Sequence, residues 1–427
     1  MERTILHCDC NSFFASVETL LRPELKNVPT AVCGDPESRH GVILAKNELA
    51  KQYGVRTAET IWQAKRKCPD LVLVGTHFTE YRKYSQQING IYRRYTDLVE
   101  PFSIDESWLD VTGSRALFGG GKRIADELRA VISRETGLTV SVGVSFNKIF
   151  AKLGSDYKKP DATTVISRGN YRKIVFPLPA GALMFCGRKM SEGLASLGIH
   201  TIGDLAGSSR TFLEKRFGKA GAVLWDYANG LASDPVRSYC DVPEVKSVGN
   251  SVTFRRDLSG EEDIRRGISA ICDKVASRLR KEHLKCRVVQ IGIKNPSLKT
   301  ISRQKTLRRP THLANELAAA AMELMHTCWN FSAPVRMLSV AGTGLVPEDT
   351  MPEQLSLFQP LGTEPCEKEE RLESALDTIR NKYGSGSVTT GALMKDDLGV
   401  GGLHRKDPDG GVPAQRTGHL PGRSSLP

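Results

Sequence analysis

The sequence predicts an α+β fold in which two mixed regions flank a helical one, and three observations support this prediction. The chain has 427 residues, of which 40% are hydrophobic and 25% charged, so its length and composition fit about three packed domains. Short apolar strands alternate with amphipathic helices in residues 4–165 and again in residues 247–345, whereas residues 166–241 show mostly helical segments. We expect each sheet to be covered by helices, in the first region on one face only.

The formal net charge of +12 predicts a polyanionic partner, either nucleic acid or an acidic membrane surface. The ten cysteines are scattered without a Cys-x-x-Cys pair, which disfavours a zinc site or a disulfide framework and favours reduced thiols. The first residues lack the apolar stretch of a signal peptide, and no run of about 18 apolar residues occurs. We therefore expect a cytoplasmic protein without a membrane span.

Two adjacent carboxylates, Asp105 and Glu106, lie inside an apolar run that is bounded by Pro101 and Gly113. This pattern predicts two short strands that meet at a turn. Charge repulsion and desolvation disfavour two carboxylates at such a turn unless a positive group offsets them, and a divalent metal would do so. An ordinary solvated acidic turn is the alternative at this point.

The first strand of the chain also ends on an acid, because residues 4–9 have the pattern of a buried strand that finishes at Asp9. Asn11 and Ser12 then predict the start of a helix over residues 13–21, which ends near Pro23. A carboxylate beside a helix N-terminus suits a metal together with a phosphate. A strand–turn–helix without any ligand is equally compatible with these residues.

The rest of the first region continues this alternation up to Pro160. Residues 139–145 predict a central strand, and the helix after it carries Lys148 and Lys152 on one face. The other predicted strands are residues 28–33, 41–44 and 71–74, and the other predicted helices are residues 45–53, 61–67, 81–95 and 122–136.

Residues 166–241 predict short helices that are joined at glycines such as Gly187 and Gly198. Helical hairpins of this kind can offer backbone N–H groups to DNA phosphates, although many helical turns contain glycine without binding anything.

Residues 242–347 predict a separate basic domain that carries most of the net charge. Its predicted order is strand, helix, strand, strand, helix, strand, which gives two β-α-β halves and one four-stranded sheet. A strongly positive sheet face would suit a nucleic-acid backbone, and a solvated basic surface is the alternative.

Residues 348–427 predict a flexible tail, with one further helix over residues 372–383 and disorder beyond about residue 395. The short apolar peptide at residues 354–358 is typical of a docking segment, because exposed leucine and phenylalanine are unfavourable unless they bind a partner. The alternative is that the peptide packs back on its own domain.

Taken together, these motifs resemble those of the Y-family translesion DNA polymerases of the DinB, or polymerase IV, type. The resemblance covers about residues 1–358. The residues that carry it are Asp9, Ser12-Phe13-Phe14 with Val17-Glu18, Ser103-Ile104-Asp105-Glu106 with Leu109-Asp110, Val142-Gly143-Val144-Ser145 with Asn147-Lys148, and Lys159-Pro160.

The resemblance implies a polymerase core of palm, fingers and thumb plus a separate little-finger domain. Palm and fingers would span residues 1–165, with the fingers at about 15–77, and the helical thumb would span 166–241. The little finger would be residues 242–347. The tail would hold a clamp-binding peptide, whose residues are Gln354, Leu355, Leu357 and Phe358.

The resemblance also implies a template-directed DNA polymerase of low fidelity, active in translesion synthesis and damage tolerance with two Mg²⁺ ions. The implied metal ligands are Asp9, Asp105, Glu106 and the carbonyl of Cys10. The implied nucleotide-binding residues are Ser12, Phe13, Phe14, Lys51 and Lys159. Phe14 would be the steric gate that excludes a ribose 2′-hydroxyl. The implied partners of the monomer are primer–template DNA, deoxynucleotides and a sliding clamp.

Two positions in the fingers depart from the family. Many members have a tyrosine and an arginine three residues apart for the triphosphate, and here Glu48 and Lys51 stand instead. A carboxylate does not stabilise phosphate, and lysine lacks the bidentate fork of arginine. A DNA- and clamp-binding protein with a polymerase fold and little catalysis is therefore a second hypothesis. A third is another two-metal enzyme, such as a nucleotide cyclase.

Overall fold

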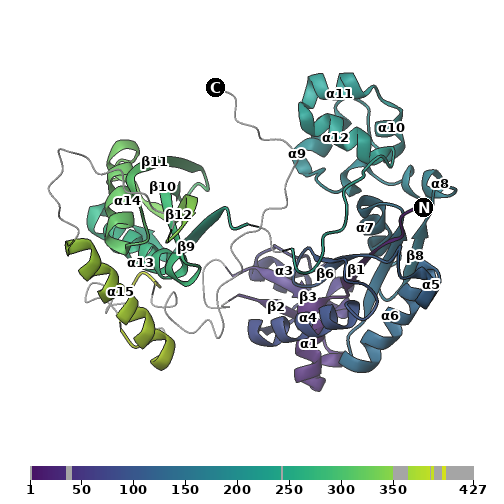
Figure 1. Ribbon diagram of the computed structural model, residues 1–427, viewed down its shortest axis with the longest axis horizontal. Coiled ribbons are helices and arrows are strands. Elements are labelled where there is room, and N and C mark those ends of the chain that lie inside the picture. Colours follow the sequence, from purple (N-terminus) through teal and green to yellow (C-terminus); the bar gives the residue numbers. More distant parts are fainter. Residues whose placement is uncertain are drawn as a thin grey trace. The chain divides into compact units, whose positions relative to one another are not determined.

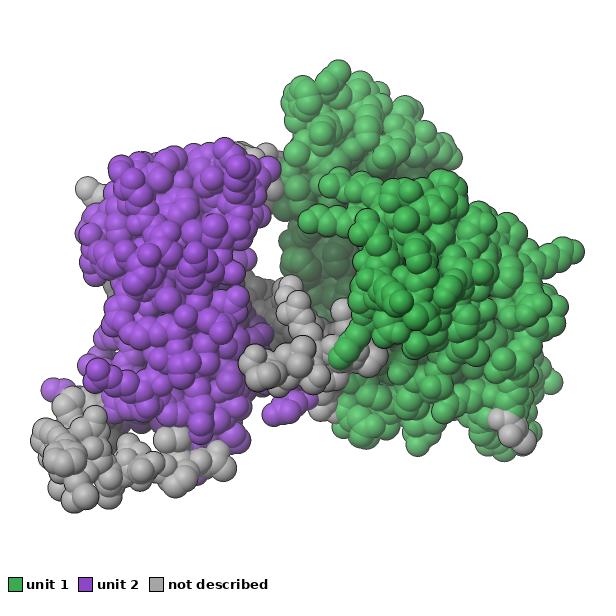
Figure 2. All heavy atoms as spheres, turned by 90° about the horizontal axis from the view of Figure 1, so that it is seen from above, with its two compact units in different colours: residues 1–242, 421–427 green, residues 243–420 purple. Residues whose placement is uncertain are grey.

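The computed structural model describes residues 2–34, 41–241, 244–349, 364–384, 386–388 and 397–400. The chain divides into two compact units near residue 242 (Figures 1 and 2). Unit 1 contains a five-stranded sheet, a three-stranded sheet and a group of helices, and unit 2 contains a four-stranded sheet with its own helices. The predicted clamp-binding peptide at residues 354–358 lies outside the described residues.

The five-stranded sheet of unit 1 has β1 at its centre. The strand order is β5 (Val99–Pro101), β6 (Glu106–Asp110), β1 (Ile5–Cys10), β7 (Val140–Ser145) and β8 (Thr163–Ile166). β1 runs antiparallel to both of its neighbours, and every residue of β1 and β7 is buried. Central strands that are buried on both faces are expected to be continuously apolar, so the polar residues within β1 are exceptional.

Helices cover both faces of this sheet, so the expectation that they lie on one face is wrong. Alternate residues of β1, among them Leu6 and Cys8, pack in one core with α4 (Phe78–Tyr92) and α6 (Gly121–Thr136). The intervening residues face α7 (Lys148–Tyr157), where Ile5 packs with Ala151 and His7 bonds to Ser155.

Gly143 in β7 explains how α7 lies so close to the sheet. A Cβ at this position would lie 1.9 Å from the carbonyl oxygen of Ala151 and 2.4 Å from the amide nitrogen of Ser155. Only glycine lets the helix backbone rest directly on the strand. The close packing of α7 carries its polar side chains over β1, to the face on which Asp9 of that strand also lies.

The three-stranded sheet of unit 1 lies in the region predicted to form the fingers, and its core is small. The strand order is β3 (Ile43–Lys46), β2 (Thr30–Cys33) and β4 (Val72–Val74). This sheet packs with the short helices α2 (Glu48–Gln52) and α3 (Ile61–Lys67) around residues such as Ile43, Ala50 and Ala64. The elements between the two sheets are α1 (Phe13–Leu21) and η1 (Pro23–Asn27).

The remaining described part of unit 1 is helical, as predicted for residues 166–241. Its elements are α8 (Tyr171–Val175), η2 (Ala180–Ala182), α9 (Arg188–Ala195), α10 (Ile202–Gly207), α11 (Arg210–Phe217) and α12 (Lys219–Ala228). The short helix α5 (Arg115–Phe118) precedes α6. After α12 the chain returns to the five-stranded sheet, where the buried Glu100 accepts hydrogen bonds from the backbone and the guanidinium of Arg237.

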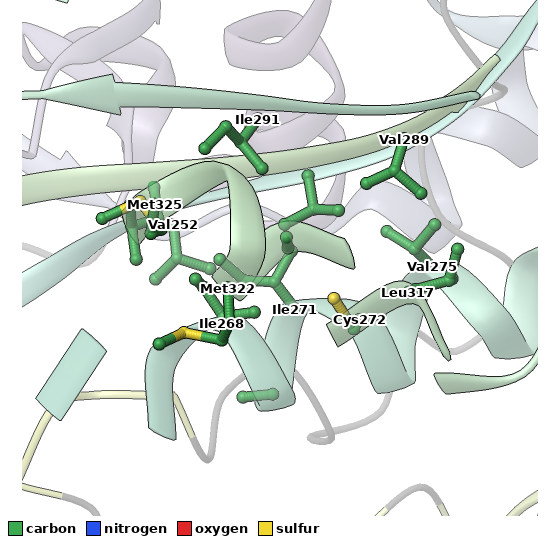
Figure 3. Packing of buried hydrophobic residues seen from close by; sticks show 14 of the residues in the cluster. Val252, Ile268, Ile271, Cys272, Val275, Val289, Ile291, Leu317, Met322 and Met325 are labelled. Carbon is green, nitrogen blue, oxygen red and sulfur yellow. The ribbon is translucent and has the colours of Figure 1, made fainter. Parts of the chain in front are cut away.

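Unit 2 has the predicted order of two β-α-β halves. Its antiparallel sheet has the strand order β11 (Thr300–Thr311), β10 (Leu284–Lys294), β12 (Val335–Pro347) and β9 (Ser247–Leu258). The helices α13 (Gly260–Lys281) and α14 (Ala314–Cys328) pack against it around a continuous apolar core (Figure 3). Inward residues of the strands, such as Val252, Val289 and Ile291, meet inward residues of the helices, such as Ile271 and Leu317.

The sheet face that points away from α13 and α14 is less charged than the sequence predicts. The alternation along each strand places one row of small residues across it, in which the register pairs Ser251 with Ser339, Ser339 with Gly292 and Gly292 with Ser302. The next row pairs Gly249, Ala341, Gln290 and Gln304. The basic residues on this face, such as Arg255 and Arg308, lie near strand ends.

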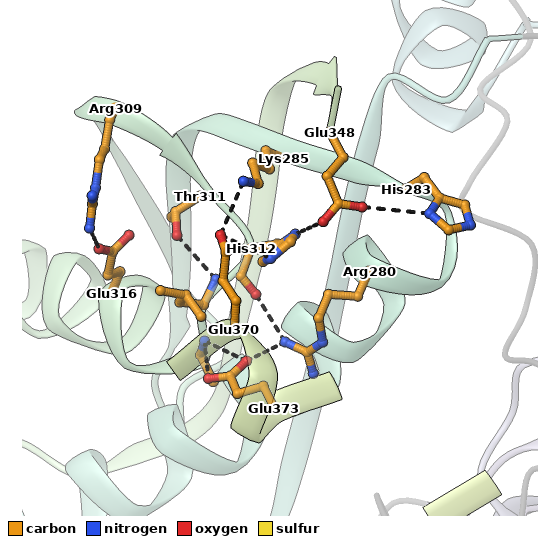
Figure 4. Close-up of polar contacts among 12 residues, drawn as sticks. Arg280, His283, Lys285, Arg309, Thr311, His312, Glu316, Glu348, Glu370 and Glu373 are labelled. Atoms are coloured by element: carbon orange, nitrogen blue, oxygen red, sulfur yellow. Dashed lines mark hydrogen bonds and ion pairs between the residues drawn. The ribbon is translucent and has the colours of Figure 1, made fainter. Parts of the chain in front are cut away.

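Two basic residues of unit 2, Arg280 and Lys285, lie beneath α15 (Glu364–Tyr383), which begins earlier than the predicted helix at 372–383 (Figure 4). Arg280 forms ion pairs with Glu373 and Asp377, and Lys285 lies 3.1 Å from Glu370. Residues 397–400 also belong to the fold, since Leu398 and Val400 are buried in the core of unit 2. The helix expected in the tail is present and begins earlier, and the disorder expected beyond about residue 395 does not hold for residues 397–400.

Candidate active site

Four of the predicted site residues meet where β1 ends beside the start of β6. The antiparallel register places Asp9 directly opposite Glu106. The amide of Cys10 donates a hydrogen bond of 3.0 Å to the carbonyl of Asp105, which fixes the turn before β6 against the end of β1. Because residues opposite each other in an antiparallel pair lie close together, the carboxylates share one small volume.

Three donors contact these carboxylates. The ammonium of Lys159 lies 2.6 Å from Oδ2 of Asp9. The ammonium of Lys152, on α7, lies 3.0 Å from both carboxylate oxygens of Glu106. The hydroxyl of Ser103 donates to Oδ1 of Asp105 at 2.6 Å. The cluster therefore attracts positive charge, and it holds one more carboxylate than ammonium groups.

The pKa values of all three carboxyl groups are shifted, upward for Asp9 and Asp105 and downward for Glu106. Burial and the charge of Glu106 raise the pKa of Asp9 to about 7, although Lys159 opposes the shift. The pKa of Asp105 is raised by burial and by the Glu106 charge, against the hydrogen bond from Ser103. Burial also opposes ionisation of Glu106, but His7 and Lys152 outweigh it and hold the pKa of Glu106 well below its usual range.

The donor set fits a divalent cation that a substrate helps to hold. Carboxylate oxygens are the protein ligands that Mg²⁺ prefers, and Mg²⁺ is usually bound by one or two carboxylates together with substrate phosphates. Among the described residues, no three His, Cys, Asp or Glu side chains are arranged to enclose a metal by themselves. Asp9, Asp105 and Glu106 thus fit an open metal site, to which a bound triphosphate would add its oxygens.

His7 and Lys152 are site neighbours that the sequence prediction did not assign. His7 is fully buried, its Nδ1 lies 2.8 Å from the Ser155 hydroxyl, and its Nε2 lies 3.7 Å from Glu106. The spacing of Lys148 and Lys152 already placed both lysines on one helix face. Only the packing of α7 across β1 shows that Lys152 meets Glu106.

Phe14 belongs to a braced aromatic cluster at the start of α1. Its ring is stacked on Tyr81, with centroids 4.3 Å apart and planes 15° apart, and Phe78 meets it edge-on at 5.8 Å. The hydroxyl of Tyr81 donates to the buried carboxylate of Glu18. Phe13 is buried behind this cluster. The Phe14 ring is therefore held in place from α1 and α4 together.

Glu48 links Ser12 to Lys51, because it contacts both of them. The hydroxyl of Ser12 donates to Glu48 at 3.4 Å, and Glu48 lies 3.4 Å from the ammonium of Lys51. Both side chains of the Glu48–Lys51 pair are about half exposed. Within the described residues, Lys51 contacts none of the carboxylates of the candidate metal site.

Comparisons with known proteins point to one family over most of the chain. Residues 8–156 match the impB/mucB/samB family, and residues 245–357 match the impB/mucB/samB family C-terminal domain. A protein named DNA polymerase IV from Acetivibrio thermocellus is 48% identical over 397 residues, which cover 93% of this chain and 98% of that protein. The chain belongs to the Y-family DNA polymerases of the DinB type. The family recognised from the sequence motifs is thereby confirmed.

Further similarities support the fold of this DinB-type polymerase. DNA polymerase IV 1 of Bacillus subtilis is 37% identical over 92% of this chain and 94% of its own length. A solved Y-family DNA polymerase chimera, Dbh-Dpo4(243-245)-Dbh, has a TM-score of 0.71 at 24% identity and covers 81% of this chain and 99% of the chimera. The predicted α+β fold, a polymerase core plus a separate four-stranded domain, is confirmed. Among the described residues, no helix is both long and apolar enough to cross a membrane.

Proposed function

We propose that this DNA-directed DNA polymerase extends primers at low fidelity in translesion synthesis and damage tolerance, in the cytoplasm on nucleoid DNA. The observation that carries the proposal is the meeting of Asp9, Asp105 and Glu106 at the ends of β1 and β6. We assign the region around this sheet to the palm, the three-stranded sheet to the fingers, residues 166–241 to the thumb and unit 2 to the little finger.

Asp9, Asp105, Glu106 and the carbonyl of Cys10 are the proposed ligands of two Mg²⁺ ions. When bound, such ions activate the attacking 3′-oxygen and neutralise the charge of the leaving pyrophosphate. The chain's own part is to hold the carboxylates together on rigid strands, which the buried β1–β6 pairing does. Lys152 and His7 keep Glu106 ionised, so this carboxylate is ready to bind a cation at neutral pH.

Lys159 and Phe14 are proposed to position the incoming nucleotide. Lys159 follows α7 and reaches Asp9, so its ammonium stands beside the place where the triphosphate would share the cations. Phe14 is the second residue of α1, close in sequence to Asp9 and Cys10, where a flat ring can lie beneath the sugar. Phe13 supports this ring, and Ser12 and Lys51 are placed at the edge of the nucleotide site.

The open sheet face of unit 2 is proposed to contact the DNA backbone. Its rows of serine, glycine, alanine and glutamine let a phosphate approach closely and offer hydroxyl and amide donors, which position a duplex without specifying its sequence. Arginines near the strand ends add charge at the margins of the face. Contacts of this kind suit an enzyme that accepts any template.

A primer-extension assay tests the function. The purified protein with Mg²⁺, a primed template and four deoxynucleotides should extend the primer. It should also extend the primer past a lesion in the template. The alternative is a DNA- and clamp-binding protein with weak or no catalysis. It is favoured by Glu48, which contacts Ser12 and would repel the negative charge of a bound triphosphate. Tight DNA binding without any extension would establish that alternative and reject the polymerase proposal.

The sliding clamp is a proposed partner through Gln354, Leu355, Leu357 and Phe358. Replacing both Leu357 and Phe358 by alanine is expected to leave extension without the clamp unchanged, because these residues lie far along the chain from the palm. Stimulation by the clamp should be lost, since two apolar anchors of the docking segment are removed. Extension rates with and without the clamp measure this effect, and equal stimulation of both proteins would reject the docking role.

A further inference from the structure

Trp62, on the short fingers helix α3, is unusually exposed. It exposes 66% of its surface, whereas the other three tryptophans are buried or half-buried. The guanidinium of Arg66, one turn further along α3, lies over the indole ring at 4.8 Å from its centroid. Exposed aromatic rings are not rare, but an exposed indole that a cation holds in one orientation indicates a binding surface.

The charges around Trp62 favour a polyanion. Residues 61–67 contain Lys65, Arg66 and Lys67 and no acidic residue. Lys67 pairs with Glu59, but among the described residues neither Lys65 nor Arg66 forms an ion pair. An aromatic face with unpaired cations beside it is the combination that binds single-stranded nucleic acid, because bases stack on the ring while cations follow the phosphates. A duplex offers fewer free base faces than a single strand does.

The fold places Trp62 within a few nucleotides of the candidate active site. The start of α3 is joined to the start of β3, since Val42 and Thr60 form a bridge and Ala58 donates to the carbonyl of Ile43. β3 then leads into α2, whose Glu48 contacts Ser12 beside the catalytic carboxylates. A strand of this length spans about 13 Å, which corresponds to roughly four stacked nucleotides.

We propose that Trp62 and Arg66 form a stacking platform for an unpaired base of the template strand ahead of the primer end. The inference rests on the proposed polymerase function, because only a templated reaction supplies such a strand. The indole stacks on the base, Arg66 holds the indole from its other side, and Lys65 and Arg66 neutralise adjacent phosphates. The platform would hold the single-stranded template in one position before it enters the candidate active site.

DNA-binding titrations test the platform. The probes are a primed template with a 5′ single-stranded overhang and the same duplex made blunt. We expect Trp62→Ala to weaken binding of the overhang DNA about tenfold and to leave binding of the blunt duplex unchanged. Arg66→Gln should reduce the salt dependence of overhang binding by about 0.7 in the slope of log K against log salt. Tyr53→Ala is the matched control, because Tyr53 is an exposed aromatic of the same fingers region without a cation over its ring.

Tryptophan fluorescence provides an independent readout. Overhang DNA should quench a component of the emission that is absent in Trp62→Phe, whereas blunt DNA should not. If Trp62→Ala binds overhang and blunt DNA as the unchanged protein does, while both proteins extend primers, the platform is rejected and the polymerase function stands. If neither protein extends a primer, the proposed function fails, and the binding data still decide whether Trp62 contacts a single strand. Equal losses on both DNA forms would also reject the platform.

Discussion

Asp105→Asn is expected to lower the kcat of primer extension about a thousandfold or more. Asparagine keeps the size of the side chain and can still accept from Ser103, but it removes one of the negative charges that would bind the cations. Metal ions contribute several kcal/mol to the stabilisation of a phosphoryl-transfer transition state, and about 4 kcal/mol corresponds to a thousandfold change in rate. Single-turnover extension at saturating nucleotide measures the effect.

Asp110→Asn is the matched control for this loss. Asp110 lies on the same strand β6, four residues beyond Glu106, and its carboxylate accepts a hydrogen bond from the backbone of Thr112. Asparagine can accept the same bond, so extension should continue at close to the original rate. Both variants should retain the thermal unfolding temperature to within a few degrees. A fully active Asp105→Asn protein would show that the carboxylate cluster is not the catalytic centre.

The local pattern of the sequence was sufficient to predict most strands and helices. The acids Asp105 and Glu106 were placed on a turn between two short strands because apolar residues surround them, and β5 and β6 lie on either side of that turn. The order of unit 2 was likewise predictable, since alternation and helical periodicity are properties of neighbouring residues. β9, β11 and β12 run on through polar residues, because pairing with a neighbouring strand continues there.

What the sequence could not show depends on contacts between distant segments. The contact of Lys152 with Glu106 requires α7 to rest on β7, and that packing depends on Gly143, whose role appears only when Ala151 and Ser155 are seen against it. The same holds for α15, whose acidic residues meet Arg280 and Lys285 from far along the chain. An excess of charge on one domain is visible in a sequence, but the pairing that neutralises it is not.

In the candidate nucleotide site, too, some features were predictable from the sequence, whereas contacts between distant segments were not. Asp9 is predictable from its place at the end of a strand before a helix, whereas the role of Phe14 follows from the resemblance to the family. The brace behind Phe14 was not predicted, since it joins α1 to Tyr81 and Phe78 on α4. Glu18 adds a further link, because its buried carboxylate accepts from Tyr81, His77 and Arg22 at once. These contacts make the position of the Phe14 ring a property of the fold.

Phe14→Val is expected to raise the ratio of ribonucleotide to deoxynucleotide incorporation about a hundredfold, which is the discrimination that a well-fitted apolar site can apply against one added hydroxyl. The ring is braced, because Tyr81 stacks on one side and Phe78 meets it edge-on. A 2′-hydroxyl beneath the sugar would therefore clash with Phe14 rather than displace it, and overpacking of a rigid contact is destabilising. Valine removes the ring and leaves space for the hydroxyl. The kcat/KM values for matched ribo- and deoxynucleotides measure the change, with Phe212→Val, at an exposed phenylalanine of α11, as the control. An unchanged ratio in Phe14→Val would place the sugar elsewhere and assign the aromatic cluster to the stability of α1.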